Sequence, residues 1–383
     1  MRDDVGQLLW VGFAGPTVPA GLRARLDAGA AGATVLFKRN LAISTVGSSA
    51  AGALANVTGG TAVPQEVVDL DALIALNREL HRAAPDGTPA LIAVDQEGGL
   101  VQRVRAPATM WPPMMAHDGL RVGEDEQVAE RVGRAMGEEL RALGFDIDFA
   151  PVLDVHTNPT NPVIGERAFG RDADTVARRA LAFARGLDAA GVLSCGKHFP
   201  GHGDTATDSH LELPRVDHAW DRLDKVELAP FRLAVKANLP MLMTAHVVFA
   251  ALDDKRPATL SEQVVAGLLR GKLGYRGVIV SDDLDMRAIA GTMGIDQAAT
   301  QAIRAGCDVL LLCCNEQYQA EAEVALIKAA ERDSEFRRRV GESAARVRAM
   351  KKAHAARKLP ALARDVIGSF EHKKLADRLA GRA

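Results

Sequence analysis

Short apolar runs recur along the chain, and a segment with helical periodicity follows most of them. Eight runs have the length and composition of buried strands. They are residues 8–13, 33–37, 90–94, 145–149, 192–195, 240–244, 277–281 and 308–312. Eight strand–helix units in one α/β chain predict a single-domain (β/α)8 barrel of the TIM type rather than an open, doubly wound sheet. No G-x-G-x-x-G follows the first run, so the sequence also lacks the main dinucleotide-binding signal.

The segments between these runs predict amphipathic helices with recognisable ends. Residues 124–143 place apolar side chains four residues apart, and Gly144 supplies a helix stop. Further helices are predicted over 174–189, 262–273, 317–330 and 335–357. Because the last two follow the eighth strand, they predict a helical C-terminal extension of the barrel.

The same pattern sets the expected domain boundaries. We expect one catalytic barrel over residues 1–357 and a basic tail over 358–383, either a solvated surface helix or a frayed end. Residues 43–64 are small, polar and rich in glycine, which predicts a long loop after the second strand. A plain surface insertion is the preferred interpretation of this loop, and a lid over the active face is the alternative.

Composition and charge narrow the class of partner. The chain has 48% hydrophobic and 25% charged residues, as globular proteins do. A formal net charge of -2 gives no electrostatic case for nucleic acid or an anionic membrane, and 4% aromatic residues do not predict extended stacking platforms. No apolar run approaches the roughly 18–20 residues that span a bilayer, and no signal peptide is evident. We therefore expect a cytoplasmic protein that is a monomer or a weak homo-oligomer.

The four cysteines are Cys195, Cys307, Cys313 and Cys314. Three lie in apolar, strand-like runs, and no pair has the C-x-x-C spacing of a metal or redox site. We interpret them as reduced core thiols, which agrees with a cytoplasmic location.

Charged and polar residues directly follow five consecutive predicted strands. They lie in segments 95–103, 151–167, 197–210, 244–246 and 281–286. Because the carboxyl ends of barrel strands meet at one face, these segments predict a shared pocket there. Capping of the next helix would account for a single Asp or Ser. It does not account for Arg103, Lys197 and His198 as well.

Segment 197–210 is the densest of these in titratable groups, and it admits two interpretations. One is a metal-dependent hydrolase, with ligands drawn from His198, His202, Asp208, His210 and His246. Pro200 and Gly201 interrupt the helix that such a His-x-x-x-His pair needs, so we expect neither metal nor cofactor. His202 is instead interpreted as a structural residue that folds the loop on itself.

The second interpretation is acid–base chemistry combined with a nucleophile. Asp208 stands two residues before His210, where a carboxylate can orient an imidazole and raise its basicity. Asp282 is the first acid after a buried strand and can attack an electrophilic carbon. Strand alternation predicts that its neighbour Asp283 points away from the pocket.

Longer motifs around these residues resemble a known family. Lys197 to Gly203 reads KHFPGHG, and Asp208-Ser209-His210 follows it; DQEGG begins at Asp95, and SDDL begins at Ser281. These motifs, with FAPVLDV from Phe149, resemble those of glycoside hydrolase family 3 β-N-acetylhexosaminidases, and the order is the same. The likeness covers about Trp10 to Cys313 and is strongest to the single-domain cytosolic enzymes of peptidoglycan recycling.

The resemblance implies roles for individual residues. Asp282 would be the nucleophile that forms a glycosyl-enzyme intermediate, His210 the general acid/base, and Asp208 its partner. Positions that bind the sugar are implied at Asp95, Arg103, Arg167, Lys197 and His198. The implied reaction removes terminal non-reducing β-linked N-acetylglucosamine, from muropeptides or other N-acetylglucosaminides, with retention of configuration.

Two rivals remain beside this reading. A catalytically silent sugar-binding barrel would be expected to lose Asp282 or the Asp208–His210 pair, and this chain keeps all three. A β-glucosidase or xylosidase of the same family would take its acid/base from another domain. The 43–64 insertion is longer than the resemblance predicts, which affects the expected contacts on the acceptor side.

Overall fold

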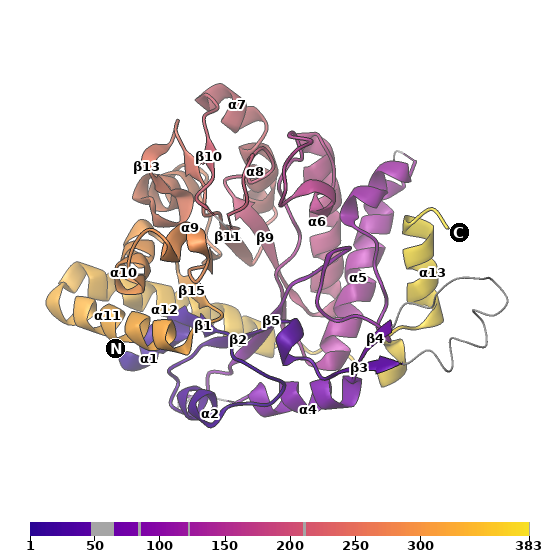
Figure 1. The fold of residues 1–383 in the computed structure, drawn as a ribbon, viewed down its shortest axis with the longest axis horizontal. Helices are drawn as coiled ribbons and strands as arrows, with labels where there is room; N and C mark the ends of the chain where they lie inside the picture. Colours follow the sequence, from indigo (N-terminus) through magenta and orange to yellow (C-terminus); the bar gives the residue numbers. More distant parts are fainter. Residues whose placement is uncertain (47–64, 83–85, 122, 210–211, 383) are drawn as a thin grey trace.

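The computed structural model describes residues 1–46, 65–82, 86–121, 123–209 and 212–382. Its centre is a closed barrel of eight parallel strands, in the order β1-β15-β14-β11-β9-β8-β5-β2 (Figure 1). The strands are β1 (Leu9–Val11), β2 (Ala33–Leu36), β5 (Leu91–Val94), β8 (Ile147–Asp148), β9 (Leu193–Phe199), β11 (Met241–Thr244), β14 (Val278–Asp283) and β15 (Val309–Leu312). Each overlaps one predicted run, so the (β/α)8 prediction is confirmed.

The barrel strands are buried on both faces, as expected when helices cover a parallel sheet. Side chains that point inward fill the barrel, and Trp10 stacks on Phe149 with ring centroids 6.5 Å apart. Side chains that point outward join the helices in a second, larger apolar cluster. This division explains why the strands read as continuous apolar runs rather than as alternating ones.

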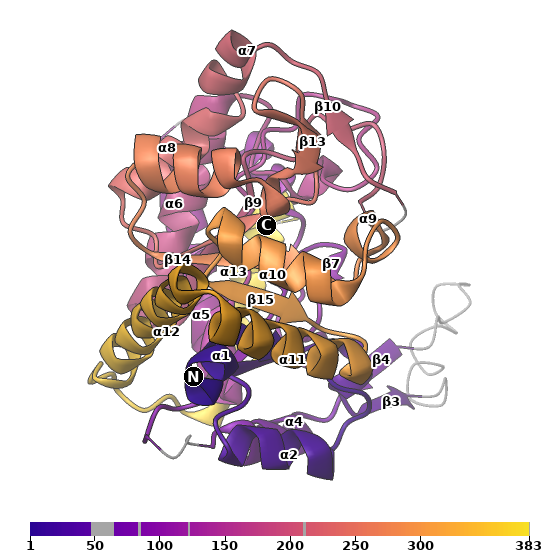
Figure 2. The same cartoon turned by 90° about the vertical axis from the view of Figure 1, so that its left-hand side faces the viewer.

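Helices surround the barrel, and α10, α11 and α12 pack beside one another outside β15 (Figures 1 and 2). The α-helices are α1 (Arg2–Leu8), α2 (Ala20–Asp27), α4 (Leu70–Leu80), α5 (Asp125–Leu143), α6 (Ala173–Ala190), α7 (Trp220–Lys225), α8 (Leu228–Lys236), α9 (Arg287–Ala290), α10 (Ile295–Ala305), α11 (Glu316–Arg332), α12 (Ser334–Ala355) and α13 (Phe370–Leu379). Gly144 ends α5 with φ of 90°, as predicted. A π-helix, η5 (Gln263–Lys272), covers the predicted 262–273 helix.

Shorter elements decorate the ends of the barrel. The 3₁₀ turns are η1 (Lys38–Asn40), η2 (Met114–Gly119), η3 (Gly165–Arg167), η4 (Ala258–Leu260) and η6 (Arg364–Val366). Three small sheets pair β3 (Ile43–Val46) with β4 (Gln65–Val68), β6 (Gln96–Gly98) with β7 (Val101–Gln102), and β12 (Val248–Phe249) with both β10 (Arg215–Val216) and β13 (Asp253–Pro257). Within the part of the chain that is described, no helix combines the length and apolarity that a bilayer-spanning segment needs.

Two expectations about the periphery need correction. The predicted 43–64 loop begins as a strand, because Ile43 to Val46 pair antiparallel with Gln65 to Val68. Residues 47–64 lie outside the described residues. Of the two alternatives for the C-terminal tail, the structure has the helix and not the frayed end, but this helix is docked rather than solvated, because α13 lies beside α5 and buries Leu375 and Leu379 (Figure 1). The predicted pattern emphasised the basic residues of the tail and missed this apolar face.

Candidate active site

A pocket of about 420 Å³ lies where the barrel strands end. It is lined by Asp95 after β5, by Lys197 and His198 of β9, and by Asp282 of β14. Arg103 and Arg167 also line it, from the β7 and η3 segments. Six of the eight residues predicted for the site therefore meet in one cavity. Its walls also contain apolar side chains, among them Phe37, Phe149, Met243 and Leu311.

Local backbone geometry places two of these cations. Gly98 and Gly99 have φ of 95° and 59°, so they allow the tight turn between β6 and β7 that brings Arg103 back to Asp95. The fifth strand extends further than predicted, through Phe199, because the apolar and polar residues of 193–199 are all buried. Lys197 is therefore held on a barrel strand, and the predicted loop begins only after it.

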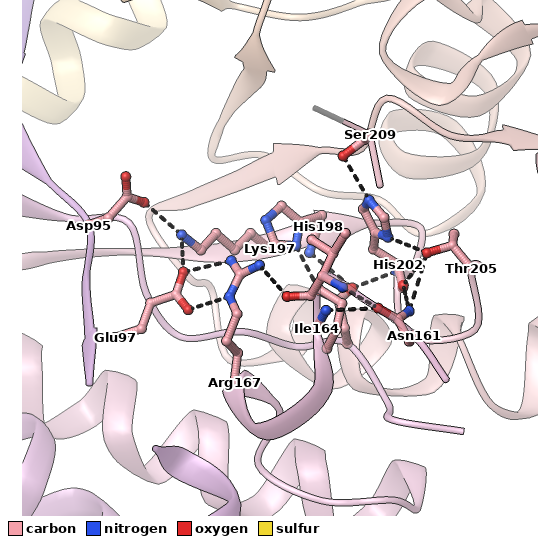
Figure 3. A network of polar contacts seen from close by, with 12 residues as sticks. Asp95, Glu97, Asn161, Ile164, Arg167, Lys197, His198, His202, Thr205 and Ser209 are labelled. Carbon is pink, nitrogen blue, oxygen red and sulfur yellow. Dashed lines mark hydrogen bonds and ion pairs between the residues drawn. The ribbon is translucent and has the colours of Figure 1, made fainter. Parts of the chain in front are cut away.

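Opposite charges meet in a mostly buried network at the pocket (Figure 3). Lys197 Nζ lies 2.8 Å from Asp95 Oδ1 and 2.5 Å from Glu97 Oε1. Arg167 donates two parallel bonds to Glu97, of 2.7 and 2.8 Å. Arg103 lies 3.4 Å from the second oxygen of Asp95. Bidentate and charge-assisted bonds of this kind hold the cations in fixed directions.

The pKa values of this network follow from its pairing. Burial alone raises the pKa of Glu97, but the charges of Arg167 and Lys197 outweigh it and lower the pKa to about 2. Burial also raises the pKa of Asp95, but the charges of Lys197 and Arg103 outweigh burial. The pKa of Asp95 is therefore well below its ordinary value. Burial would lower the pKa of Lys197, yet Asp95 and Glu97 raise it. All three groups are therefore charged at neutral pH, and Asp95 and Lys197 present a charged acceptor and a charged donor to the cavity.

The buried carboxylate of Asp154 orients His198, which lines the pocket beside Lys197 on β9. Asp154 is fully buried, and its Oδ2 lies 2.7 Å from Nδ1 of His198. Its Oδ1 accepts the backbone N–H groups of His198 and His202, at 3.2 and 2.6 Å. Burial raises the pKa of Asp154, but His198 outweighs burial and the net pKa is lowered. The carboxylate thus fixes the proton of His198 on Nδ1.

His202 ties the following loop to itself, as predicted, and it also lines the pocket. Its Nδ1 lies 2.9 Å from Thr205 Oγ1, and its Nε2 lies 3.1 Å from Ser209 Oγ (Figure 3). Burial, with the charge of His198, lowers the pKa of His202 to about 4, so the ring is neutral. Ser209 lines the pocket, whereas its neighbour Asp208 is half-buried and lies outside the lining. His210 lies outside the described residues.

Asp282 lines the pocket as predicted, but Asp283 does not point away from it. The register of β14 with β15 shifts between Val280 and Asp283, so the strict alternation ends there and both carboxylates face the cavity. Oδ1 of Asp283 accepts the backbone N–H groups of Asp285 and Cys313, both at 3.1 Å. Burial, and then the neighbouring Asp285, raise the pKa of Asp283 to about 8.

With this geometry in view, the chain can be compared with known proteins. Residues 1–350 match the family described as "Glycosyl hydrolase family 3 N terminal domain". The chain belongs to glycosyl hydrolase family 3. The match covers all eight barrel strands and each described site residue.

Three relatives of this family 3 chain illustrate the similarity. Beta-hexosaminidase A of Pseudoalteromonas piscicida is 36% identical over 357 residues, which cover 85% of this chain and 58% of that protein. A family 3 beta-N-acetylglucosaminidase from Paenibacillus sp. str. FPU-7 superimposes with a TM-score of 0.84 at 37% identity, over 100% of this chain and 68% of that one. NagZ from Neisseria gonorrhoeae, solved with N-trifluoroacetyl-D-glucosamine, gives a TM-score of 0.74 at 30% identity, over 98% of each chain. The chain thus spans little more than half the length of the first of these relatives.

Another set of groups at the pocket of this family 3 barrel has the donor types of a metal site. One ligand atom from each of Asp283, Asp285 and Cys314 lies within 4.8 Å of the others. However, Oδ2 of Asp285 already accepts the backbone N–H groups of Cys314 and Asn315. The two carboxylates therefore bind the ends of β14 and β15 together. Cys314 is exposed, so the expectation of a core thiol is wrong for this cysteine, because it lies beyond the end of β15.

Two residues of the site received no role from the sequence. Glu97 and Asp154 were visible as strand-end acids, yet only the fold brings Glu97 to Arg167 and Asp154 to His198. A usable signal did exist, since a carboxylate buried beside a polar strand end requires a cationic or N–H partner. The sequence could not say which partner that is.

Proposed function

We propose that the protein is a retaining β-N-acetylhexosaminidase that removes terminal, non-reducing, β-linked N-acetylglucosamine. The observation that supports this most is that Asp282 lines the same cavity as the residues to which the motif resemblance assigns sugar binding, namely Asp95, Arg103, Arg167, Lys197 and His198. The cavity volume of about 420 Å³ suits a small ligand. The names of the hexosaminidase relatives support the same activity.

In the proposed first step, a carboxylate oxygen of Asp282 attacks the anomeric carbon and forms a covalent ester. The glycosidic bond breaks, and His210 donates a proton to the departing oxygen. In the second step His210 takes a proton from water, whose oxygen attacks the same carbon and releases Asp282 as a carboxylate. Two inversions give net retention. Asp208 is proposed to orient His210 throughout.

The proposed natural substrate is a peptidoglycan fragment, as the motif resemblance implies. The network around Lys197 supports a role in holding sugar hydroxyls, because its charged donors and acceptors face the cavity in fixed positions. A cytoplasmic location and a monomeric or weakly homo-oligomeric state stay predictions from the sequence.

The test is hydrolysis of an aryl N-acetyl-β-glucosaminide beside the aryl β-glucoside, with NMR of the first-formed anomer. We expect turnover of the first substrate only, and a β-anomeric product. Asp282→Ala and His210→Ala should each lower kcat by about 10³-fold or more, since each removes a group that reacts in the transition state. Asp254→Ala is a matched control, because Asp254 is exposed on the short peripheral strand β13.

Three results would contradict the proposal. Undiminished activity of Asp282→Ala would remove the nucleophile assignment. An α-anomeric first product would replace double displacement by a single displacement. Loss of activity on treatment with a chelator, with recovery on adding a divalent ion, would favour the metal-dependent alternative.

A further inference from the structure

The strand that carries Asp282 loses its regular partner on one side just before that residue. β14 pairs with β11 in register from Val278 to Val280, and among the described residues this register ends at Val280. On its other side β14 stays bonded to β15. There the Leu311 N–H donates to Ser281 Oγ at 3.1 Å, and the Leu284 N–H donates to the Leu311 carbonyl at 3.0 Å. Residues 281–284 therefore keep hydrogen bonds to β15, although the pairing of β14 with β11 has ended before them.

His246 lies on the side where that ladder has ended. It follows β11, is fully buried and does not line the pocket. Its Nε2 lies 3.0 Å from the carbonyl oxygen of Asp283. Because a carbonyl oxygen can only accept, Nε2 carries a proton and donates it to this peptide group. This carbonyl belongs to the peptide bond between residues 283 and 284, one position beyond Asp282.

The other ring nitrogen of His246 is also held. Nδ1 lies 2.8 Å from Oγ1 of Thr259, in the buried turn η4. That hydroxyl lies 2.9 Å from Oγ1 of Thr244 and 3.0 Å from the carbonyl of Ala245, so it belongs to a compact polar cluster at the end of β11. Because Nε2 carries the ring proton, Nδ1 accepts the hydroxyl proton of Thr259, and these two buried bonds hold the ring in one direction.

We infer that His246 is a positioning residue for the nucleophile, an inference that rests on the role proposed for Asp282. Its Nε2–H donates to the Asp283 carbonyl on the side of β14 that faces β11, in place of the backbone bonds that β11 no longer supplies there. The Cys313 N–H holds the Asp283 side chain on the other flank. Asp282 sits in the register shift between Val280 and Asp283, where the pairing with β11 has ended and the pairing with β15 is irregular. The two bonds together aim its carboxylate into the cavity.

A matched pair of amides separates this role from ordinary packing. In His246→Gln the side-chain amide nitrogen can take the place of Nε2 and donate to the Asp283 carbonyl. In His246→Asn the shorter amide reaches only the place of Nδ1, beside Thr259. The two variants have similar polarity, so a merely structural role predicts similar behaviour, whereas positioning predicts that Gln is the better substitute.

The readout is the rate at which a 5-fluoro glycosyl fluoride of N-acetylglucosamine labels the full-length protein covalently, followed by intact mass and peptide mapping. Fluoride leaves without a general acid, so this rate reports attack by Asp282 and is independent of His210. We expect His246→Asn to be labelled about 10- to 100-fold more slowly than wild type, the range that a small misplacement of a reacting group causes. His246→Gln should be labelled within about threefold of wild type. The inhibition constant for free N-acetylglucosamine and the melting temperature should agree between the two variants.

The outcomes distinguish the inference from the function on which it rests. If the wild type is not labelled at Asp282, the proposed function fails. If the wild type is labelled and the Asn and Gln variants react at equal rates, the positioning role of His246 is wrong. Should His246→Asn not fold, Thr259→Val replaces it, since that change removes the support at Nδ1. Thr259→Val must then slow labelling more than it weakens N-acetylglucosamine binding.

Discussion

Replacing Glu97 by Gln tests the energetics of the charged network at the pocket floor. The side chain is 2% exposed, and both of its oxygens accept bonds from Arg167 while one also contacts Lys197. The amide of Gln has almost the same shape, but it has no charge and turns a donor toward two cations. Glu97→Gln therefore removes the ion pairing with little change in packing.

Two estimates of the cost agree. Removing one partner of a buried ion pair costs about 3–5 kcal/mol. The lower end applies here, since Lys197 keeps Asp95 at 2.8 Å and Arg167 keeps the carbonyl of Val163 at 3.0 Å. Independently, a pKa that falls from 4.5 to about 2 corresponds to about 3 kcal/mol, at roughly 1.36 kcal/mol per pKa unit. We expect Glu97→Gln to lower the free energy of unfolding by about 3 kcal/mol at pH 7.

The effect should depend on pH with a defined sign. The native state holds the Glu97 carboxylate charged down to about pH 2, whereas the unfolded chain takes up the proton near its ordinary value of 4.5. The stabilisation is therefore complete above about pH 4.5 and is lost as the pH falls toward 2. At pH 3.5 the difference between wild type and variant should be smaller by about 1 kcal/mol.

The assay is urea unfolding of both proteins at pH 7 and pH 3.5, followed by circular dichroism and tryptophan fluorescence. Glu66→Gln is the control, because Glu66 pairs with Lys38 at 2.7 Å on the exposed surface and should cost less than about 1 kcal/mol. A Glu97→Gln protein as stable as the control at pH 7 would refute the reasoning. So would a difference that does not shrink at acid pH.

Three further predictions concern other parts of the chain. Gly203→Ala should destabilise the loop that follows β9 and abolish the proposed activity, because a Cβ there would overlap the Val155 carbonyl. Gly341→Ala, with open space in α12, should be neutral or stabilising by up to about 1 kcal/mol in thermal unfolding. Burial, with the charge of Arg348, lowers the pKa of Lys351 to about 7, so the unfolded chain binds more protons from about pH 7 to 10.5. Wild-type stability should rise with pH over that window, and Lys351→Met should rise less in urea titrations. Leu375→Ala should cost about 2 kcal/mol or more and raise amide hydrogen exchange in α13, since this side chain is 6% exposed in the helix that packs on α5.

The sequence predicted the barrel well because the hydrophobic period and the length of each apolar run determine which segments form strands and which form helices. Each of the eight strands lies in a buried run such as Val309 to Leu312, and the long helices α5 and α6 have an apolar stripe and a glycine stop, at Gly144 and Gly191. Peripheral elements were harder. Helix α13 has a charged sequence and few apolar positions, so only its contact with α5 distinguishes a docked helix from a frayed tail.

The candidate site shows a similar limit. Strand order brought Asp95, Lys197 and Asp282 to one cavity as predicted, because the carboxyl ends of barrel strands always share a face. The partners of these residues were not predictable in the same way. Glu97 and Arg167 stand 70 positions apart, and their bidentate contact depends on how the β6–β7 turn and η3 approach each other.

Asp283 shows why sequence periodicity no longer predicts side-chain direction at the rim of the barrel. Alternation assigns side chains to faces only while a ladder enforces a period of two residues, and that condition holds for β14 up to Val280. Beyond it the register shifts, and the next two acids face the same cavity. Because irregular strand ends are where a barrel presents reactive groups, periodicity is least informative at the residues that matter most for chemistry. Sequence can therefore identify the strand that carries the proposed nucleophile, while the choice between neighbouring acids depends on bonds such as that from His246, which no periodicity encodes.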